Sequence, residues 1–256
     1  MLKQLVKALP AVGLTVHLAA GAAGAVESPF IGDWKLNAAK SRMPDEMRVT
    51  RAGAKYKFDF GGVVETIAVD GTFQPGYGKT LLSVKPAASD RWIVERQEDG
   101  KPQVKAVWTL SKDGRTLTDK FLQFMADGST LTMDYVYQRA SGGGGFTGEW
   151  KSIKETMNSP FALQVKAHEG DGLSLVTPAQ HATKNLKLDG KEYPMASGAT
   201  SSARRVNART VLITDKAGGA LTDTRQLELS PDLKILTITT HITGRDRPNV
   251  MVFERQ

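Results

Sequence analysis

The tetrapeptide Gly32-Asp33-Trp34-Lys35 recurs as Gly148-Glu149-Trp150-Lys151, 116 residues further along the chain. Other matches follow in the same order at offsets of 116 to 119 residues: 70–71 with 189–190, 108–111 with 227–230, 117–118 with 236–237 and 135–139 with 251–255. Matches that keep their order along the whole chain indicate an internal duplication. The sequence therefore predicts two copies of one unit of about 110 residues.

The joint between the copies is predicted at residues 141–145, which read Ser-Gly-Gly-Gly-Gly. A Gly/Ser run of this kind is typical of a flexible linker. Its alternative, a phosphate-binding loop, would need a G-x-G-x-x-G or Walker A pattern, and neither occurs. We therefore expect a first unit at 26–140, a linker at 141–145 and a second unit at 146–256.

Residues 1–25 resemble a secretory signal peptide. Lys3 and Lys7 form a positive start, residues 8–22 are apolar and rich in alanine, and Ala23-Gly24-Ala25 fits the cleavage pattern. The alternative is a membrane anchor, which needs about 20 apolar residues and is longer than this stretch. The pattern predicts cleavage after Ala25, export to the periplasm or medium, and no membrane span in the mature chain.

Both copies carry the alternation of β-strands. Tyr56, Phe58 and Phe60 alternate with polar residues, as do several apolar residues of 104–110. Asp-Gly pairs, which favour tight turns, occur at 70–71, 99–100, 113–114 and 127–128. About eight short strands per copy predict an all-β protein of two tandem antiparallel up-and-down barrels. An open β-sandwich is the alternative.

A tryptophan opens each copy and an arginine closes it. Trp34 and Arg139 are 105 residues apart, and so are Trp150 and Arg255. In a barrel the first and last strands pair, so we expect each arginine to stack on the tryptophan of its own copy. Such a cation–π contact is worth about 0.5–2 kcal/mol.

Gly-x-Trp near the start and arginine on the last strand resemble the lipocalin and calycin barrels. The strings at 32–41 (GDWKLNAAKS), 111–118 (SKDGRTLT) and 189–194 (DGKEYP) are similar to exported bacterial lipocalin-like domains. The resemblance covers the mature chain, one domain per copy, although the second copy lacks the Asn-Ala-Ala-Lys-Ser string. It implies barrel cavities for small apolar ligands, but a fold does not fix a function.

The sequence lacks the residues that several classes of function require. The chain has no cysteine, which excludes disulfides and thiolate sites, and its net charge of +7 is not clustered as nucleic-acid binding would require. His168, His181 and His241 occur in the second copy only and match no metal-ligand spacing. No cofactor motif is present. Asp59, Glu65, Glu95 and Asp134 alternate with apolar residues, and we expect them to point outward rather than act as general bases.

Aromatic residues are concentrated in the first copy, at Tyr56, Phe58, Trp92, Trp108 and Tyr135. They are predicted to line a ligand cavity; the alternative is that they fill the barrel. The leading hypothesis is an exported, monomeric or weakly associated protein that binds a small apolar or amphipathic molecule, with the positive charge allowing an anionic one. An envelope interaction module and a barrel enzyme are the alternatives, and the second requires a buried ionisable cluster.

Overall fold

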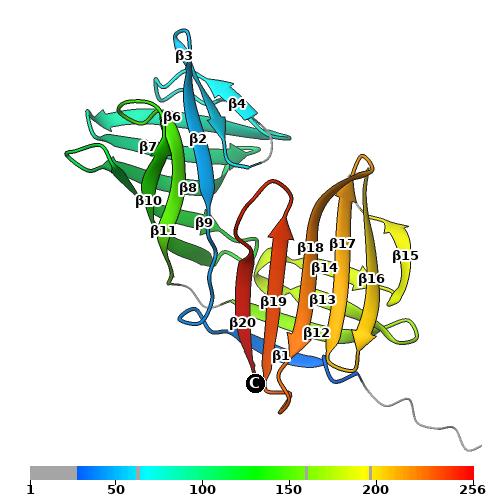
Figure 1. Cartoon of the computed structure of the whole chain (residues 1–256). Coiled ribbons are helices and arrows are strands. Elements are labelled where there is room, and N and C mark those ends of the chain that lie inside the picture. The colour runs from blue at the N-terminus through cyan, green and yellow to red at the C-terminus, as the bar shows by residue number, and fades with distance from the viewer. Residues whose placement is uncertain (1–27, 62–63, 159–160, 196–197) are drawn as a thin grey trace, which may run out of the picture.

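The computed structural model describes residues 28–61, 64–158, 161–195 and 198–256. The predicted signal peptide lies outside the described residues. The chain folds into two ten-stranded antiparallel sheets, which confirms the predicted all-β fold with two barrel-like units (Figure 1). Among the described residues no helix is long and apolar enough to cross a membrane.

The N-terminal unit is the sheet with strand order β4-β3-β2-β11-β10-β9-β8-β7-β6-β5. Its hairpins follow the Asp-Gly turns, where Gly100, Gly114 and Gly128 have positive φ angles of 75°, 65° and 85°. These strands are β2 Glu46–Ala52, β3 Lys55–Asp59, β4 Val64–Ile67, β5 Gln74–Pro75, β6 Thr80–Ala88, β7 Arg91–Glu98, β8 Lys101–Leu110, β9 Thr116–Phe124, β10 Thr130–Ser141 and β11 Gly148–Met157.

The C-terminal unit is the sheet with strand order β14-β13-β12-β1-β20-β19-β18-β17-β16-β15. A short 3-10 helix, η1 Pro178–Gln180, joins two of its strands. The strands are β1 Gly32–Leu36, β12 Ala162–His168, β13 Gly172–Thr177, β14 Ala182–Leu186, β15 Asp189–Pro194, β16 Ala199–Asn207, β17 Thr210–Ala217, β18 Ala220–Leu229, β19 Ile235–Ile242 and β20 Asn249–Arg255.

The first strands of the two copies are exchanged. β1 lies between β12 and β20 in the C-terminal unit, and β11 takes the matching place between β2 and β10 in the N-terminal unit. Figure 1 shows β1 beside β20, although they stand at opposite ends of the chain. The expected division at 26–140 and 146–256 therefore assigns these two strands to the wrong sheets. The chain instead passes from one unit to the other between β1 and β2 and again between β11 and β12.

The glycine-rich segment explains the exchange. β10 ends at Ser141 and β11 begins at Gly148, and the two strands pair directly, so residues 141–145 belong to a hairpin rather than to an interdomain linker. A short loop costs little closure entropy, which favours folding β11 back onto its neighbour in sequence. β11 then occupies the place that β1 would need, and β1 pairs with the other sheet.

The tryptophan–arginine contacts follow the exchange and correct the expected same-copy pairing. The Arg139 guanidinium lies 4.1 Å from the ring centre of Trp150, and Arg255 lies 4.2 Å from that of Trp34. Each indole N–H also donates to a carbonyl four residues earlier, Trp34 to Phe30 and Trp150 to Phe146, both at 3.0 Å.

The glycine of Gly-x-Trp is required by the same contact. Gly148 has φ +143°, and a Cβ atom there would lie 2.7 Å from a guanidinium nitrogen of Arg139. Gly32 has φ +145°, and a Cβ atom there would lie 2.6 Å from a guanidinium nitrogen of Arg255. A side chain would therefore be strained and would displace the arginine from the ring.

Candidate ligand-binding site

A cavity of about 320 Å³ lies inside the N-terminal unit. Strand alternation builds it, because Trp108 on β8, Asp119 and Phe121 on β9, and Tyr135 and Tyr137 on β10 all point to the inner face. Its size is at the lower end of the range for small-molecule pockets. The remaining lining residues are Asp45, Met47, Phe60, Leu82, Val94, Arg96, Val104 and Ala106.

Two buried polar atoms of this cavity have no hydrogen-bond partner among the described residues. They are Oδ1 of Asp119 and the indole nitrogen of Trp108. Asp119 and Trp108 are only 6% and 2% exposed, and they face each other across β8 and β9. Buried polar groups in folded proteins are nearly always paired. The indole N–H lies close enough to the Asp119 carboxyl to lower its pKa, but the two form no hydrogen bond of normal geometry, so a cavity occupant that bridges them would satisfy both.

The environment of the cavity raises the pKa of one carboxyl group, Asp119, and of two tyrosine hydroxyls. Burial raises the pKa of Asp119 to about 7; the neighbouring Trp108 N–H lowers it in part, and the negative charge of Asp45 raises it further. Burial also raises the pKa of the Tyr135 and Tyr137 hydroxyls, with Asp45 again adding to the effect. Both tyrosines are therefore neutral hydrogen-bond donors at physiological pH.

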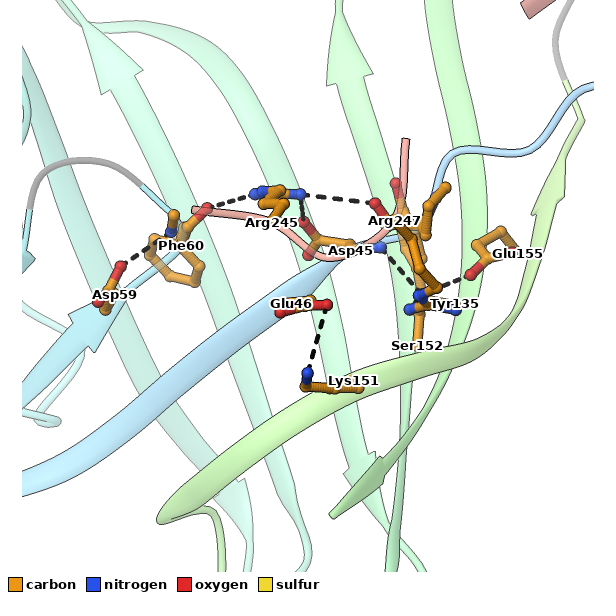
Figure 2. A network of polar contacts seen from close by, with 12 residues as sticks. Asp45, Glu46, Asp59, Phe60, Tyr135, Lys151, Ser152, Glu155, Arg245 and Arg247 are labelled. Atoms are coloured by element: carbon orange, nitrogen blue, oxygen red, sulfur yellow. Dashed lines mark hydrogen bonds and ion pairs between the residues drawn. The ribbon is translucent and has the colours of Figure 1, made fainter. Parts of the chain in front are cut away.

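The C-terminal unit reaches this cavity through Arg245, in the loop between β19 and β20. Its guanidinium donates to Asp45 Oδ1 at 2.9 Å and to the Phe60 carbonyl at 2.8 Å (Figure 2). The other carboxylate oxygen of Asp45 accepts the Tyr137 hydroxyl at 2.8 Å. Asp45, which lines the cavity, is thus held by one residue of each unit, and the Arg245 guanidinium compensates its charge.

Neighbouring contacts fix the same loop on β11. Lys151 forms an ion pair of 2.6 Å with Asp246, and Arg247 donates to Ser152 Oγ at 3.3 Å. Ser152 Oγ in turn accepts the backbone N–H of Asp45 at 2.9 Å. The loop, β11 and Asp45 therefore form one polar network that joins the units beside the cavity (Figure 2).

A buried ion pair in the N-terminal unit joins β4, at one edge of the sheet, to β7, the third strand from the opposite edge. Glu65, which is 5% exposed, accepts two hydrogen bonds from Arg96, at 2.9 and 2.6 Å, and one from the backbone N–H of Tyr77. Glu65 thus points inward, which corrects its expected outward position. Asp59, Glu95 and Asp134 are not buried, and the last two pair with lysines.

The C-terminal unit carries the same pair with its charges reversed. Lys184 and Asp215 lie 119 residues after Glu65 and Arg96, on the corresponding strands β14 and β17, and bond at 2.6 Å. The acid cluster of the cavity, by contrast, has no polar counterpart there. Asp119 and Tyr137 correspond to Ile238 and Phe253, which belong to the C-terminal core.

The five predicted ligand-binding aromatics divide into two groups. Trp108 and Tyr135 line the cavity. Tyr56, Phe58 and Trp92 pack against other rings, with Trp92 stacked on Phe146 at a centroid distance of 4.0 Å and Tyr56 edge-on to Trp92 at 5.3 Å. The filled-barrel alternative therefore describes these three residues better than the cavity hypothesis does.

Residues that sequence reasoning missed are Asp119, Asp45, Tyr137 and Arg245. Asp119 had a usable signal, because it shares the parity of the buried Leu117 and of Phe121 in an alternating strand. Tyr137 also had a signal, because it shares the face of Tyr135 on an alternating strand, whereas Asp45 and Arg245 had none, because their contact joins segments 200 residues apart.

No metal centre emerges from the described residues, which hold no group of three or more metal-ligating side chains. Comparisons of the chain with protein-family models, curated proteins and solved structures found no match.

Proposed function

We propose that the protein binds a small amphipathic molecule with an uncharged hydroxyl-type head group in the cavity of the N-terminal unit. The observation that carries this proposal is that Asp119 Oδ1 and the Trp108 indole N–H lie side by side in one cavity, and neither forms a hydrogen bond of normal geometry with a described residue. A hydroxyl group can accept from the indole and donate to the carboxyl oxygen at once.

The rest of the lining supports the amphipathic class. Met47, Leu82, Val94 and Phe121 provide an apolar surface beside the polar pair. An anionic head is disfavoured, because it would face the carboxyl groups of Asp119 and Asp45 in a buried site. The cationic Arg96 and Arg245 are already engaged by Glu65 and Asp45.

The proposal is tested by titrating the full chain with 1-octanol and following binding by calorimetry. Trp108→Phe keeps a ring but removes the N–H, so we expect about five- to tenfold weaker binding, as for the loss of one hydrogen bond. Trp92→Phe is the matched control, since Trp92 does not line the cavity. Absence of binding to the unaltered protein, or equal effects of the two substitutions, would overturn the proposal.

A barrel enzyme is the second candidate, and the buried acid favours it. A carboxyl whose pKa is about 7, next to the neutral hydroxyl of Tyr135, matches what general acid–base catalysis requires. Incubation with hydroxyl compounds and their esters, followed by mass spectrometry, separates the two candidates. A binding protein returns its ligand unchanged, whereas an enzyme converts it.

Export from the cytoplasm and kinship with lipocalin-like domains complete the proposal. They rest on the pattern of residues 1–25 and on the duplicated Gly-x-Trp and arginine positions. Expression of the whole chain in a bacterium with two membranes, followed by N-terminal sequencing of the periplasmic fraction, tests export. A mature terminus at Val26 is expected, and retention of residues 1–25 in the cytoplasm would contradict it.

A further inference from the structure

A second and larger cavity, of about 560 Å³, lies where the two units meet. Its walls come from the inner face of the C-terminal unit and from β9 and β10 of the N-terminal unit. Four of the eight methionines of the chain line it, together with phenylalanines on β20 and on the connection before β12: Met43, Met133, Met157, Met251, Phe161 and Phe253. Methionine is flexible and polarizable, which suits a surface that adapts to an apolar chain.

The two cavities lie along the same face of β9 and β10. On β9, Phe121 lines the first cavity and Gln123 lines the second. On β10, Tyr135 lines the first cavity, while Met133 and Leu131 line the second. Alternate residues of a strand share one face, so the cavities follow each other along one inner surface.

The hairpin of β9 and β10 also contacts the C-terminal unit beside the second cavity. Its turn meets η1 of the C-terminal unit, where the Asp127 N–H donates to the Ala179 carbonyl at 3.2 Å. Close to the same turn, the Asn158 N–H donates to the Thr132 carbonyl at 2.9 Å. The hairpin therefore bridges the two units, and its inner face leads from the second cavity back to the first.

Met133 stands at the boundary between the cavities. It is 4% exposed, it is the cross-strand partner of Phe121, and its sulfur accepts the Tyr135 hydroxyl at 3.4 Å. A thioether is a weak acceptor, and its side chain has three rotatable bonds. The hydrogen bond that holds the Met133 sulfur is therefore weak, and Met133 lies between residues that line the two cavities.

We propose that the two cavities form one elongated site for a long single-chain hydroxyl amphiphile, with Met133 as the gate between them. This inference rests on the proposed function and names its ligand class. The head group lies at Asp119 and Trp108, and the chain passes Met133 into the methionine-lined cavity. From Asp119 to Gln123, which lines the second cavity, β9 spans about 13 Å at about 3.3 Å per residue, so only a chain longer than this distance fills the second cavity from a head group at Asp119.

The methionine methyl groups test the proposal without any substitution. In the full chain labelled with ¹³C-methyl methionine, 1-octanol should shift the signal of Met47, which lines the first cavity. 1-Hexadecanol should shift Met47 and also Met157 and Met251, which line the second cavity. Met125 and Met195 line neither cavity and serve as internal controls.

Each outcome decides between the two proposals. If both alcohols shift Met47 and neither shifts Met251, the elongated site is overturned and the proposed function stands. If neither alcohol shifts any methionine, the proposed function fails as well. If hexadecanol shifts Met157 and Met251 but leaves Met47 unchanged, the cavities are separate sites and the gate is overturned.

The gate itself is tested by Met133→Trp, which fills the passage. Hexadecanol should bind at least tenfold more weakly to this variant than to the unaltered protein, while octanol affinity changes by less than about twofold. Met195→Trp is the matched control outside both cavities. Unchanged hexadecanol affinity in a folded Met133→Trp protein would overturn the gate, and the methionine spectra decide the question if the variant does not fold.

Discussion

Asp119→Asn removes a buried carboxyl group while keeping the size and shape of the side chain. The carboxyl is 6% exposed and has an unpartnered oxygen beside the Trp108 indole, so its charged form is poorly solvated. The unaltered protein must accommodate that charge at alkaline pH, whereas the asparagine variant never carries it. The substitution should therefore stabilise the protein at high pH and have little effect at low pH.

The magnitude follows from the pKa of Asp119, which burial raises from 3.8 to about 7. Because the folded protein holds this proton more tightly than the unfolded chain, its contribution to stability is complete below about pH 4 and is lost as pH rises through about 7. At about 1.4 kcal/mol for each pKa unit, the loss is on the order of 4 kcal/mol. The asparagine variant should gain that amount relative to the unaltered protein between pH 4 and pH 8.

Urea unfolding followed by tryptophan fluorescence, repeated from pH 4 to pH 9, measures this difference. Subtracting the two proteins at each pH cancels the titration of groups that they share. Glu95→Gln, on the exposed face of β7, is the control, and its effect should stay within about 0.5 kcal/mol, as for surface ion pairs. A difference between the Asp119→Asn variant and the unaltered protein that does not change with pH would refute the reasoning.

Three further substitutions test the packing around the site, each by urea unfolding. Arg139→Met should cost about 2–4 kcal/mol, because it removes the contact over Trp150 and charged hydrogen bonds to carbonyls, and a cost below about 0.5 kcal/mol would show that the stack is incidental. Glu65→Lys should cost about 3 kcal/mol or more by leaving Arg96 buried beside a like charge, and Glu65→Lys with Arg96→Asp should recover most of it. No recovery of stability in the double variant would show that the buried ion pairs of the two units are not equivalent. Gly148→Ala should weaken the same stack through strain at φ +143°, and an unchanged stability would contradict that account.

The strand content of the protein was predictable because it depends on local patterns. Alternating residues such as those of 56–60, and the Asp-Gly turns at 99–100, 113–114 and 127–128, require no knowledge of distant contacts. The duplication also indicated that Trp150 and its counterpart Trp34 occupy equivalent places. Each tryptophan does contact an arginine on the last strand of a copy, as the equivalence of the copies implies.

The exchange of β1 and β11 could not be read from the same patterns. A duplicated sequence is equally compatible with Trp34 against Arg139 or against Arg255, since both copies offer the same partner surface. The choice depends on the hairpin that the segment at 141–145 closes, and a glycine-rich segment serves as a hairpin loop or as a linker. The local sequence does not distinguish these two uses.

The candidate site was only partly predictable for a related reason. Aromatic residues on alternating strands indicated the inner face, but not whether a ring packs on another ring, as Trp92 does, or borders a cavity, as Trp108 does. The polar part of the site depends on Asp45 and Arg245, which are 200 residues apart. Tertiary contacts of this range leave no period or spacing in the sequence.

The exchange of first strands is the central claim, and the absence of cysteine allows a direct test of it. Lys35 faces Glu254 across β1 and β20, whereas an unexchanged chain would place Lys35 beside Gln138 on β10. Paired cysteines at 35 and 254, or at 35 and 138, are oxidised at low protein concentration, and the monomer is then examined by mass spectrometry of its peptides. The account predicts an intramolecular disulfide for the 35/254 pair and none for the 35/138 pair. A disulfide within the monomer at 35/138, with none at 35/254, would contradict it.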